Sequence, residues 1–176
     1  MDEVAAFAGV SKGALYFHTG SKVGLLNQVF GADFTAWIDE AFAGDRRRRA
    51  VAIEDRVVRA YGRLLELMCN QPELTRIYMA AAGAGEGREH PARAMNHLLS
   101  LTASMLDDAK ARGELVDAVD SRQLAYNLWA LYYVEQHRWL LDHPVPAASR
   151  ADIERRLRAP FNVQLAGYLT PGRGPA

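Results

Sequence analysis

The sequence predicts an all-α protein with a small N-terminal head, built on a helix-turn-helix, and a helical-bundle body. Apolar residues recur at spacings of three and four along most of the chain, and no β-branched segment alternates apolar with polar residues. The 176 residues are 49% hydrophobic, enough for a sizeable core. We expect a head with its linking helix at 1–43, a helical body at 44–170, and a disordered tail at 171–176.

The first element, from Val4 to Lys22, is expected to form a helix, a tight turn and a short second helix. Gly9 permits the positive φ angle that a helix C-terminus needs. Ser11 can cap the next helix by accepting a hydrogen bond from a free backbone N–H. Leu15 is expected to point inward, and small residues on the other face would let this second helix enter a DNA groove. This element therefore predicts a DNA-recognition unit.

The same segment resembles the TetR-type (tetracycline-repressor-like) transcriptional regulators, whose signature it matches without a gap. The matching residues are Val4-Ala5, Ala8-Gly9-Val10-Ser11, Gly13, Leu15-Tyr16, His18, Ser21-Lys22 and Leu25. The string from Lys12 to His18 is also similar to γ-butyrolactone receptors of that family. Two positions depart from the signature: Thr19 stands where an aromatic residue is usual, and Val23 where Glu is usual.

The resemblance implies a homodimer that reads a palindromic double-stranded DNA operator. It also implies that residues 1–43 form the DNA-binding domain and that the helical bundle at 44–170 is the ligand-binding, regulatory and dimerisation domain. The DNA-binding residues implied are Ser11, Lys12, Gly13, Ala14, Tyr16, His18 and Lys22. Lys12 is a candidate for guanine or phosphate contacts, and Ala14 for contact with a thymine methyl group. Tyr16, His18 and Lys22 resemble phosphate contacts of the family, which position the head without reading sequence.

Family members carry a further helix ahead of this motif, and Met1 falls within the first helix of the motif. The sequence is therefore expected to lack the first helix of the head: either the start site is wrongly assigned, or the chain is truncated, or the head is incomplete. An alternative function follows: a dimeric, ligand-binding body whose incomplete head does not bind DNA by itself. In that case Leu15, Leu25, Leu26 and Val29 would be partly exposed.

The body is expected to consist of helices separated by Gly and Pro signals. Pro160 should kink or interrupt the final helix, which follows Val145-Pro146. The basic run 46–49 is interpreted as a solvated helix start, and the glycine-rich segment 83–87 as a loop. The remaining expected helices span residues 23–43, 51–70, 72–82, 91–112 and 121–141.

The expected helix over 121–141 is apolar on nearly all sides, which predicts burial against a ligand cavity, a second subunit or both. By resemblance the effector is a small molecule, apolar or aromatic, that releases a repressor from DNA. The candidate ligand-binding residues are Tyr61, Met68, Tyr78, Met105, Tyr126, Trp129 and Tyr133. The candidate dimer residues are Leu124, Leu128, Leu131, Ile153, Leu157 and Phe161.

Charge and composition limit the other functions. Twenty-one basic residues balance 21 acidic ones, so DNA affinity must come from a local patch. No apolar run is long enough for a membrane span, and Asp2-Glu3 do not fit a signal peptide. We therefore expect a cytoplasmic, nucleoid-associated protein without a membrane partner. The single cysteine, Cys69, is interpreted as a small buried hydrophobe.

An all-α enzyme is the remaining alternative. His90 and His97 could share a helix face, and His137 and His143 complete the histidines outside the head. No Cys cluster, His-Glu-x-x-His motif or nucleophile elbow accompanies them. The sequence thus predicts no catalytic residue, no metal site, no cofactor and no enzymatic activity.

Overall fold

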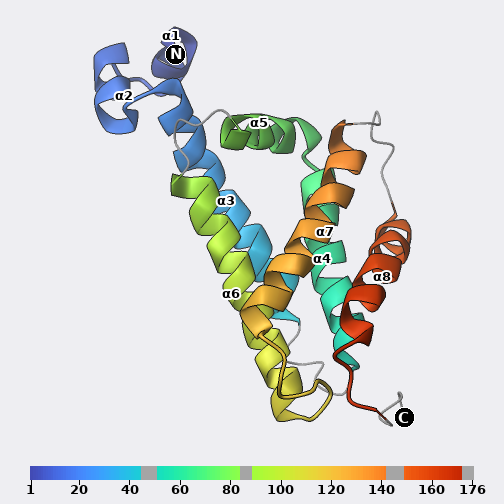
Figure 1. The fold of residues 1–176 in the computed structure, drawn as a ribbon. Helices are drawn as coiled ribbons and strands as arrows, with labels where there is room; N and C mark the ends of the chain where they lie inside the picture. The colour runs from blue at the N-terminus through green and yellow to red at the C-terminus, as the bar shows by residue number, and fades with distance from the viewer. Residues whose placement is uncertain (45–50, 84–88, 142–148, 172–176) are drawn as a thin grey trace.

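The chain is all-α, as predicted, in a computed structural model that describes residues 1–44, 51–83, 89–141 and 149–171. Within these ranges the only extended pairing is an isolated bridge between Leu115 and Leu169. Figure 1 shows α1 and α2 as a small head at the start of α3, beyond the body that the later helices form. The helices are α1 Asp2–Phe7, α2 Lys12–Thr19, α3 Lys22–Ala43, α4 Ile53–Cys69, α5 Pro72–Gly83, α6 Glu89–Ala111, α7 Ser121–Leu141 and α8 Arg150–Ala166.

Serine caps set the starts of three helices. Ser11 Oγ accepts a hydrogen bond from the Ala14 N–H at 3.1 Å, as predicted. Ser21 begins α3 in the same way, and Ser149 begins α8. Each cap satisfies a backbone donor that a helix start otherwise leaves unpaired. The cap at Ser21 fixes where α3 leaves the head.

The core is built around α4, whose Tyr61 side chain is fully buried. The Tyr61 ring makes edge contacts with Tyr132 of α7 and Phe161 of α8, at centroid distances of 5.1 and 5.3 Å. Its hydroxyl shares a 2.9 Å hydrogen bond with Thr102 of α6. Burial raises the pKa of Tyr61 above its ordinary range, so the phenol stays neutral. Tyr61 therefore joins four helices as a structural residue.

The start of α4 is capped by a residue far along the chain. Ala52 offers no capping side chain, and Glu114 accepts a hydrogen bond from the Ile53 N–H at 2.9 Å. The connector that contains Glu114 also binds the C-terminal segment, since the Thr170 N–H donates to the Glu114 carbonyl at 3.0 Å. This cap was not predicted, because sequence spacing does not reveal a partner 61 positions away.

Pro160 lies inside the continuous helix α8, so the interruption that was one of the two predicted effects does not occur. Proline removes one backbone donor and crowds the preceding turn. Leu157 and Phe161, on either side of it, are fully buried. Their burial outweighs the local cost and keeps the helix continuous.

The helix α6 begins at Glu89, before the predicted start at Pro91. Proline is tolerated in a first turn, where its missing N–H has no intrahelical acceptor. Several predicted features lie outside the described residues: the basic run 46–49, most of the loop 83–87, His143, and most of the tail 171–176.

Candidate DNA-binding head and ligand cavity

The head presents the second helix of the helix-turn-helix to solvent. Gly9 has φ of 68°, which confirms the predicted turn. No residue of α2 is buried, and Ala14 and Leu15 are half-buried. The polar candidates Lys12, Tyr16 and His18 are exposed on α2, and Lys22 is exposed at the first position of α3. Ser11 and Gly13 are exposed as well.

An ion pair joins the two head helices. Lys12 Nζ lies 2.9 Å from Asp2 Oδ1 and 3.0 Å from Asp2 Oδ2. The hydrogen bond to Asp2 raises the pKa of Lys12, and the same bond lowers the pKa of Asp2. The main cation of α2 is thus partly neutralised by a carboxylate of α1.

Side-chain hydrogen bonds at the end of α2 act within the helix and between α2 and α3. The Thr19 hydroxyl donates to the Leu15 carbonyl at 2.8 Å within α2, so the unusual Thr19 makes a backbone contact rather than an apolar one. Gln28 of α3 donates to the His18 carbonyl at 3.2 Å. The orientation of α2 is therefore tied to α3.

Several apolar side chains of the head lie in solvent. Phe7 is 96% exposed and Phe17 is 86% exposed. Leu15 and Leu25 are half-buried, while the side chains of Leu26 and Val29 lie outside the described residues. Apolar packing inside the described head is therefore sparse, and the caps and hydrogen bonds carry much of its local geometry.

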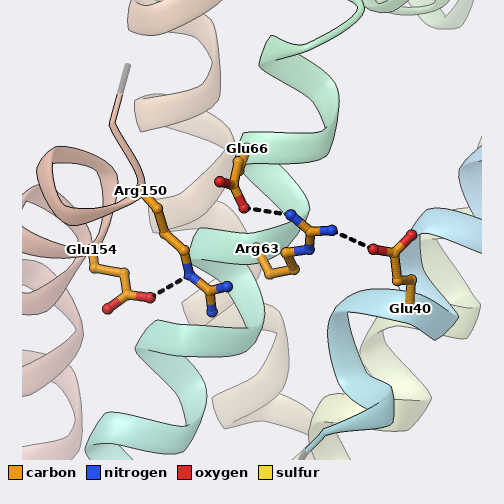
Figure 2. A network of polar contacts seen from close by, with 5 residues as sticks. All are labelled: Glu40, Arg63, Glu66, Arg150 and Glu154. Atoms are coloured by element: carbon orange, nitrogen blue, oxygen red, sulfur yellow. Dashed lines mark hydrogen bonds and ion pairs between the residues drawn. The ribbon is translucent and has the colours of Figure 1, made fainter. Parts of the chain in front are cut away.

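One of the ion pairs in Figure 2, between Glu40 and Arg63, connects the far end of α3 to the body. Arg63 of α4 pairs with Glu40 of α3 through one guanidinium nitrogen and with Glu66 of α4, at 2.6 Å, through another. Arg150 pairs with Glu154 at 2.8 Å at the start of α8. Arg63 therefore anchors the helix that carries the head to the central helix of the body.

The body contains a largely apolar cavity of about 310 Å³ bounded by α3, α4, α5, α6 and α7. No described lining residue carries a formal charge at neutral pH. The lining residues are Phe34, Ile38, Leu64, Met68, Met79, Ala92, Ala94, Met95, Leu98, Trp129, Tyr132, Tyr133 and Gln136. Such a concave apolar site with few polar groups is typical of small-molecule binding.

The predicted ligand residues divide into two groups. Met68, Trp129 and Tyr133 meet on the cavity wall. Three others do not line it: Tyr61 and Met105 are buried in the core, and Tyr126 is exposed. The side chain of the seventh candidate, Tyr78, lies outside the described residues.

Sequence reasoning missed the cavity walls supplied by α3 and α6. Phe34 and Ile38 follow the helical apolar stripe that also marks core residues, so spacing alone does not distinguish a cavity wall from close packing. Gln136 had a usable signal, since it is a polar residue inside an apolar helix. It is 6% exposed and lies on the wall.

Two hydrogen-bond donors converge on the sulfur of Met68 in this wall. The Tyr132 hydroxyl lies 2.9 Å from Met68 Sδ, and Gln136 Nε2 lies 3.3 Å from it. A thioether is a weak acceptor. Burial raises the pKa of Tyr132 well above its ordinary value, so its hydroxyl remains protonated.

The predicted dimer residues lie inside the subunit. Leu124, Leu128, Ile153, Leu157 and Phe161 are buried by the chain's own helices, and Leu131 is half-buried. A side chain that its own subunit buries has little surface left for a partner, so these five belong to the core. The exposed apolar residues of the same helices are Tyr126, Tyr133, Val134 and Val163.

The histidines of the body occupy separate sites. His97 of α6 contacts Asp39 of α3 at 2.7 Å, and His137 contacts the Tyr133 carbonyl at 3.0 Å. The side chain of His90 lies outside the described residues. Within the described ranges, no three His, Cys, Asp or Glu residues group as metal ligands. No described helix has the length and apolarity to cross a bilayer.

Solved structures align with this chain along nearly its whole length. A Mesorhizobium loti protein assigned to the TetR family of transcriptional regulators aligns with a TM-score of 0.68 at 22% identity, over 96% of this chain and 86% of that one. The chain has the TetR-family fold. A Rhodococcus sp. protein with the same assignment aligns with a TM-score of 0.64 at 25% identity, over 93% of this chain and 86% of that one.

A gamma-butyrolactone receptor also shares this TetR-type fold, with a TM-score of 0.50 and 21% identity over 98% of this chain and 79% of that one. These comparisons confirm the resemblance derived from the head motif. The TetR-fold proteins found are described as regulators or a receptor rather than enzymes, in agreement with the predicted lack of catalysis. No protein-family model and no curated protein sequence matches the chain.

Proposed function

We propose that this protein is a ligand-responsive, DNA-binding transcriptional regulator, and that it acts as a repressor. The observation that carries the proposal is the course of α3. This helix begins in the head at Lys22 and supplies Phe34 and Ile38 to the cavity wall. One rigid element therefore belongs to both the DNA-reading unit and the cavity, which is the connection that a ligand-controlled regulator needs.

The proposed mechanism couples cavity and head through the position of α3. A ligand that packs against Phe34 and Ile38 favours one position of the helix, and DNA favours another. The coupling is reciprocal: ligand weakens DNA binding by the same factor as DNA weakens ligand binding. The coupling free energy is typically about 1–3 kcal/mol. The ligand's affinity must differ between the two positions, because equal affinity would shift nothing.

The proposed DNA-binding form is a homodimer on a palindromic operator. Two heads then read half-sites about one helical turn apart, roughly 34 Å. Support for the contact surface comes from exposed apolar side chains on neighbouring helices, Tyr126 and Val134 of α7 and Val163 of α8. In this proposal the protein works in the cytoplasm, associated with the nucleoid.

Selection of bound duplexes from a random DNA pool tests the proposal. The expected result is enrichment of a palindromic site. Tyr16→Ala should then abolish the mobility shift of that site while circular dichroism of the body stays unchanged. Failure to enrich any sequence, with protein that is folded and dimeric, would count against DNA reading by this chain.

The second candidate function is a dimeric ligand-binding protein that does not bind DNA by itself. The exposure of Phe7 and Phe17 favours it, because a head with little internal packing orders its recognition helix poorly. Amide hydrogen exchange separates the two candidates. Slow exchange in α2 supports the regulator, whereas exchange in α2 at unprotected rates, with a protected body, supports the second candidate.

A further inference from the structure

The orientation of one buried amide limits what the cavity can bind. Gln136 is nearly fully buried and lies on the cavity wall. Its Nε2 lies 3.3 Å from Met68 Sδ. A thioether has lone pairs and no hydrogen to donate, so the amide nitrogen, not the amide oxygen, must face the sulfur.

This arrangement leaves the Gln136 Oε1 atom with an open acceptor site. Within the described part of the chain, Oε1 accepts no hydrogen bond. The Tyr132 hydroxyl, another polar group of a wall residue, already donates to Met68. Gln136 as a residue is 6% exposed, so a ligand in the cavity would shield Oε1 from water. Such a ligand binds best when it donates a hydrogen bond to Oε1, because an acceptor that is shielded without a partner is costly.

The remaining wall sets the charge and size of the ligand. The described lining holds no Asp, Glu, Lys, Arg or His. An ionised ligand would lose its hydration and find no counter-charge there. A cavity of roughly 150 Å³ holds one benzene ring, so a cavity of about 310 Å³ fits two fused rings.

We propose that the cavity selects a neutral, apolar molecule of about two fused rings that carries a hydroxyl group, and that Gln136 Oε1 accepts the hydrogen bond from that hydroxyl. The cavity thus selects a ligand that can donate a hydrogen bond. A ketone, ester, lactone or ether of the same size has acceptor oxygens only and leaves Oε1 unpaired. This inference rests on the proposed function, since it names the class of effector for the proposed ligand site.

Isothermal titration calorimetry with a matched set of probes tests the inference. β-Naphthol can donate, β-methoxynaphthalene can only accept, and β-naphthoate is charged. Binding of β-naphthol should be about tenfold tighter than binding of β-methoxynaphthalene, as expected when one buried acceptor is left unpaired. β-Naphthoate should not bind measurably.

Two variants assign the selectivity to the amide. Gln136→Leu keeps the size of the side chain, removes the acceptor, and should abolish the preference for β-naphthol. Gln123→Leu is the matched control, because Gln123 lies exposed on the same helix and donates to Asn127. It should keep the full preference.

The outcomes separate this inference from the proposed function. Equal binding of β-naphthol and β-methoxynaphthalene, tight binding of β-naphthoate, or a preference that survives Gln136→Leu overturns the inference while the cavity remains a ligand site. No binding of any probe overturns the inference and the ligand-responsive half of the proposed function. Selective binding of β-naphthol without any effect on DNA affinity supports the inference and contradicts the proposed coupling.

Discussion

Lys12 of α2 and Asp2 of α1 form an exposed ion pair in which Lys12 Nζ lies within 3.0 Å of both carboxylate oxygens. The pair joins the two helices of the head. It also places a negative charge beside the main cation of α2. In the proposed DNA complex, Asp2 would oppose phosphate binding in two ways: it would repel phosphate directly, and it occupies the Lys12 ammonium group.

Asp2→Asn should raise affinity for operator and random DNA alike, by severalfold at low salt. The freed Lys12 can neutralise one more phosphate, so the dependence of log affinity on log salt should steepen by about one unit. Fluorescence anisotropy over a salt series measures both quantities. Glu3→Gln is the control, since Glu3 is exposed in the same turn. An equal gain from that variant would show that net charge, not the ion pair, controls affinity.

Lys22→Ala should weaken binding to operator and random DNA by the same factor and reduce the salt slope by about one unit. Lys22 is exposed where α3 leaves the head, a position suited to a phosphate contact that carries no sequence information. The same titrations with Arg122→Ala, which removes an exposed cation of the body, should leave the slope unchanged. A normal slope for Lys22→Ala would exclude the phosphate contact.

The sequence predicted the helices well because local chemistry marks their ends. Ser11 and Gly9 are examples, since a cap and a positive φ angle depend on residues a few positions away. Spacing was less informative about partners. It marked Leu128 and Phe161 as buried faces, but helical spacing is the same whether a face packs within one subunit or against another.

The sequence predicted only part of the candidate ligand site, because helical spacing does not reveal which elements pack together. Met68 and Trp129 were identified as large apolar residues at helical spacing and do line the cavity. Phe34 lies on a helix assigned only to connect head and body, so its place in the wall depends on tertiary packing. The sequence shows that Gln136 is a polar residue within an apolar helix. It does not show the contact between Gln136 and Met68, which lies 68 positions away.

Cys69 should react slowly with thiol reagents in the folded protein. It is buried, and burial raises the pKa of its thiol to about 11, so little thiolate is present at pH 8. Labelling with a disulfide reagent should be slow in buffer and complete within the mixing time in concentrated urea. The raised pKa also makes stability depend on pH. The free energy of unfolding should fall as pH rises from about 9 towards 11, because the thiol ionises in the unfolded chain before it ionises in the folded protein. Rapid labelling of the native protein at pH 8 would show that this part of α4 opens readily.

Val163→Glu and Val134→Glu should each weaken self-association by at least about tenfold. Val163 is 80% exposed on α8 and Val134 is 57% exposed on α7, so a new carboxylate costs little in the isolated subunit. In the proposed dimer the same charge is buried without a partner. Sedimentation velocity over a concentration series measures the effect. Ile77→Glu on α5 is the control, and a similar loss from it would point to a different interface.

Glu40→Gln should reduce the effect of ligand on DNA binding more than it reduces either binding step alone. Glu40 pairs with Arg63 and thereby fixes the body end of α3 to α4. An exposed pair of this kind contributes at most about 1 kcal/mol to folding, so the melting temperature should fall by only about 2–4 °C. A loosened α3 transmits less of its displacement from the cavity to the head. With a ligand that binds the cavity, the fold-change in operator affinity should drop by about two- to fivefold.

Glu73→Gln, which breaks the exposed Glu73–Arg76 pair on α5, should leave this fold-change intact. An unaltered fold-change in Glu40→Gln would mean that coupling does not depend on this anchor.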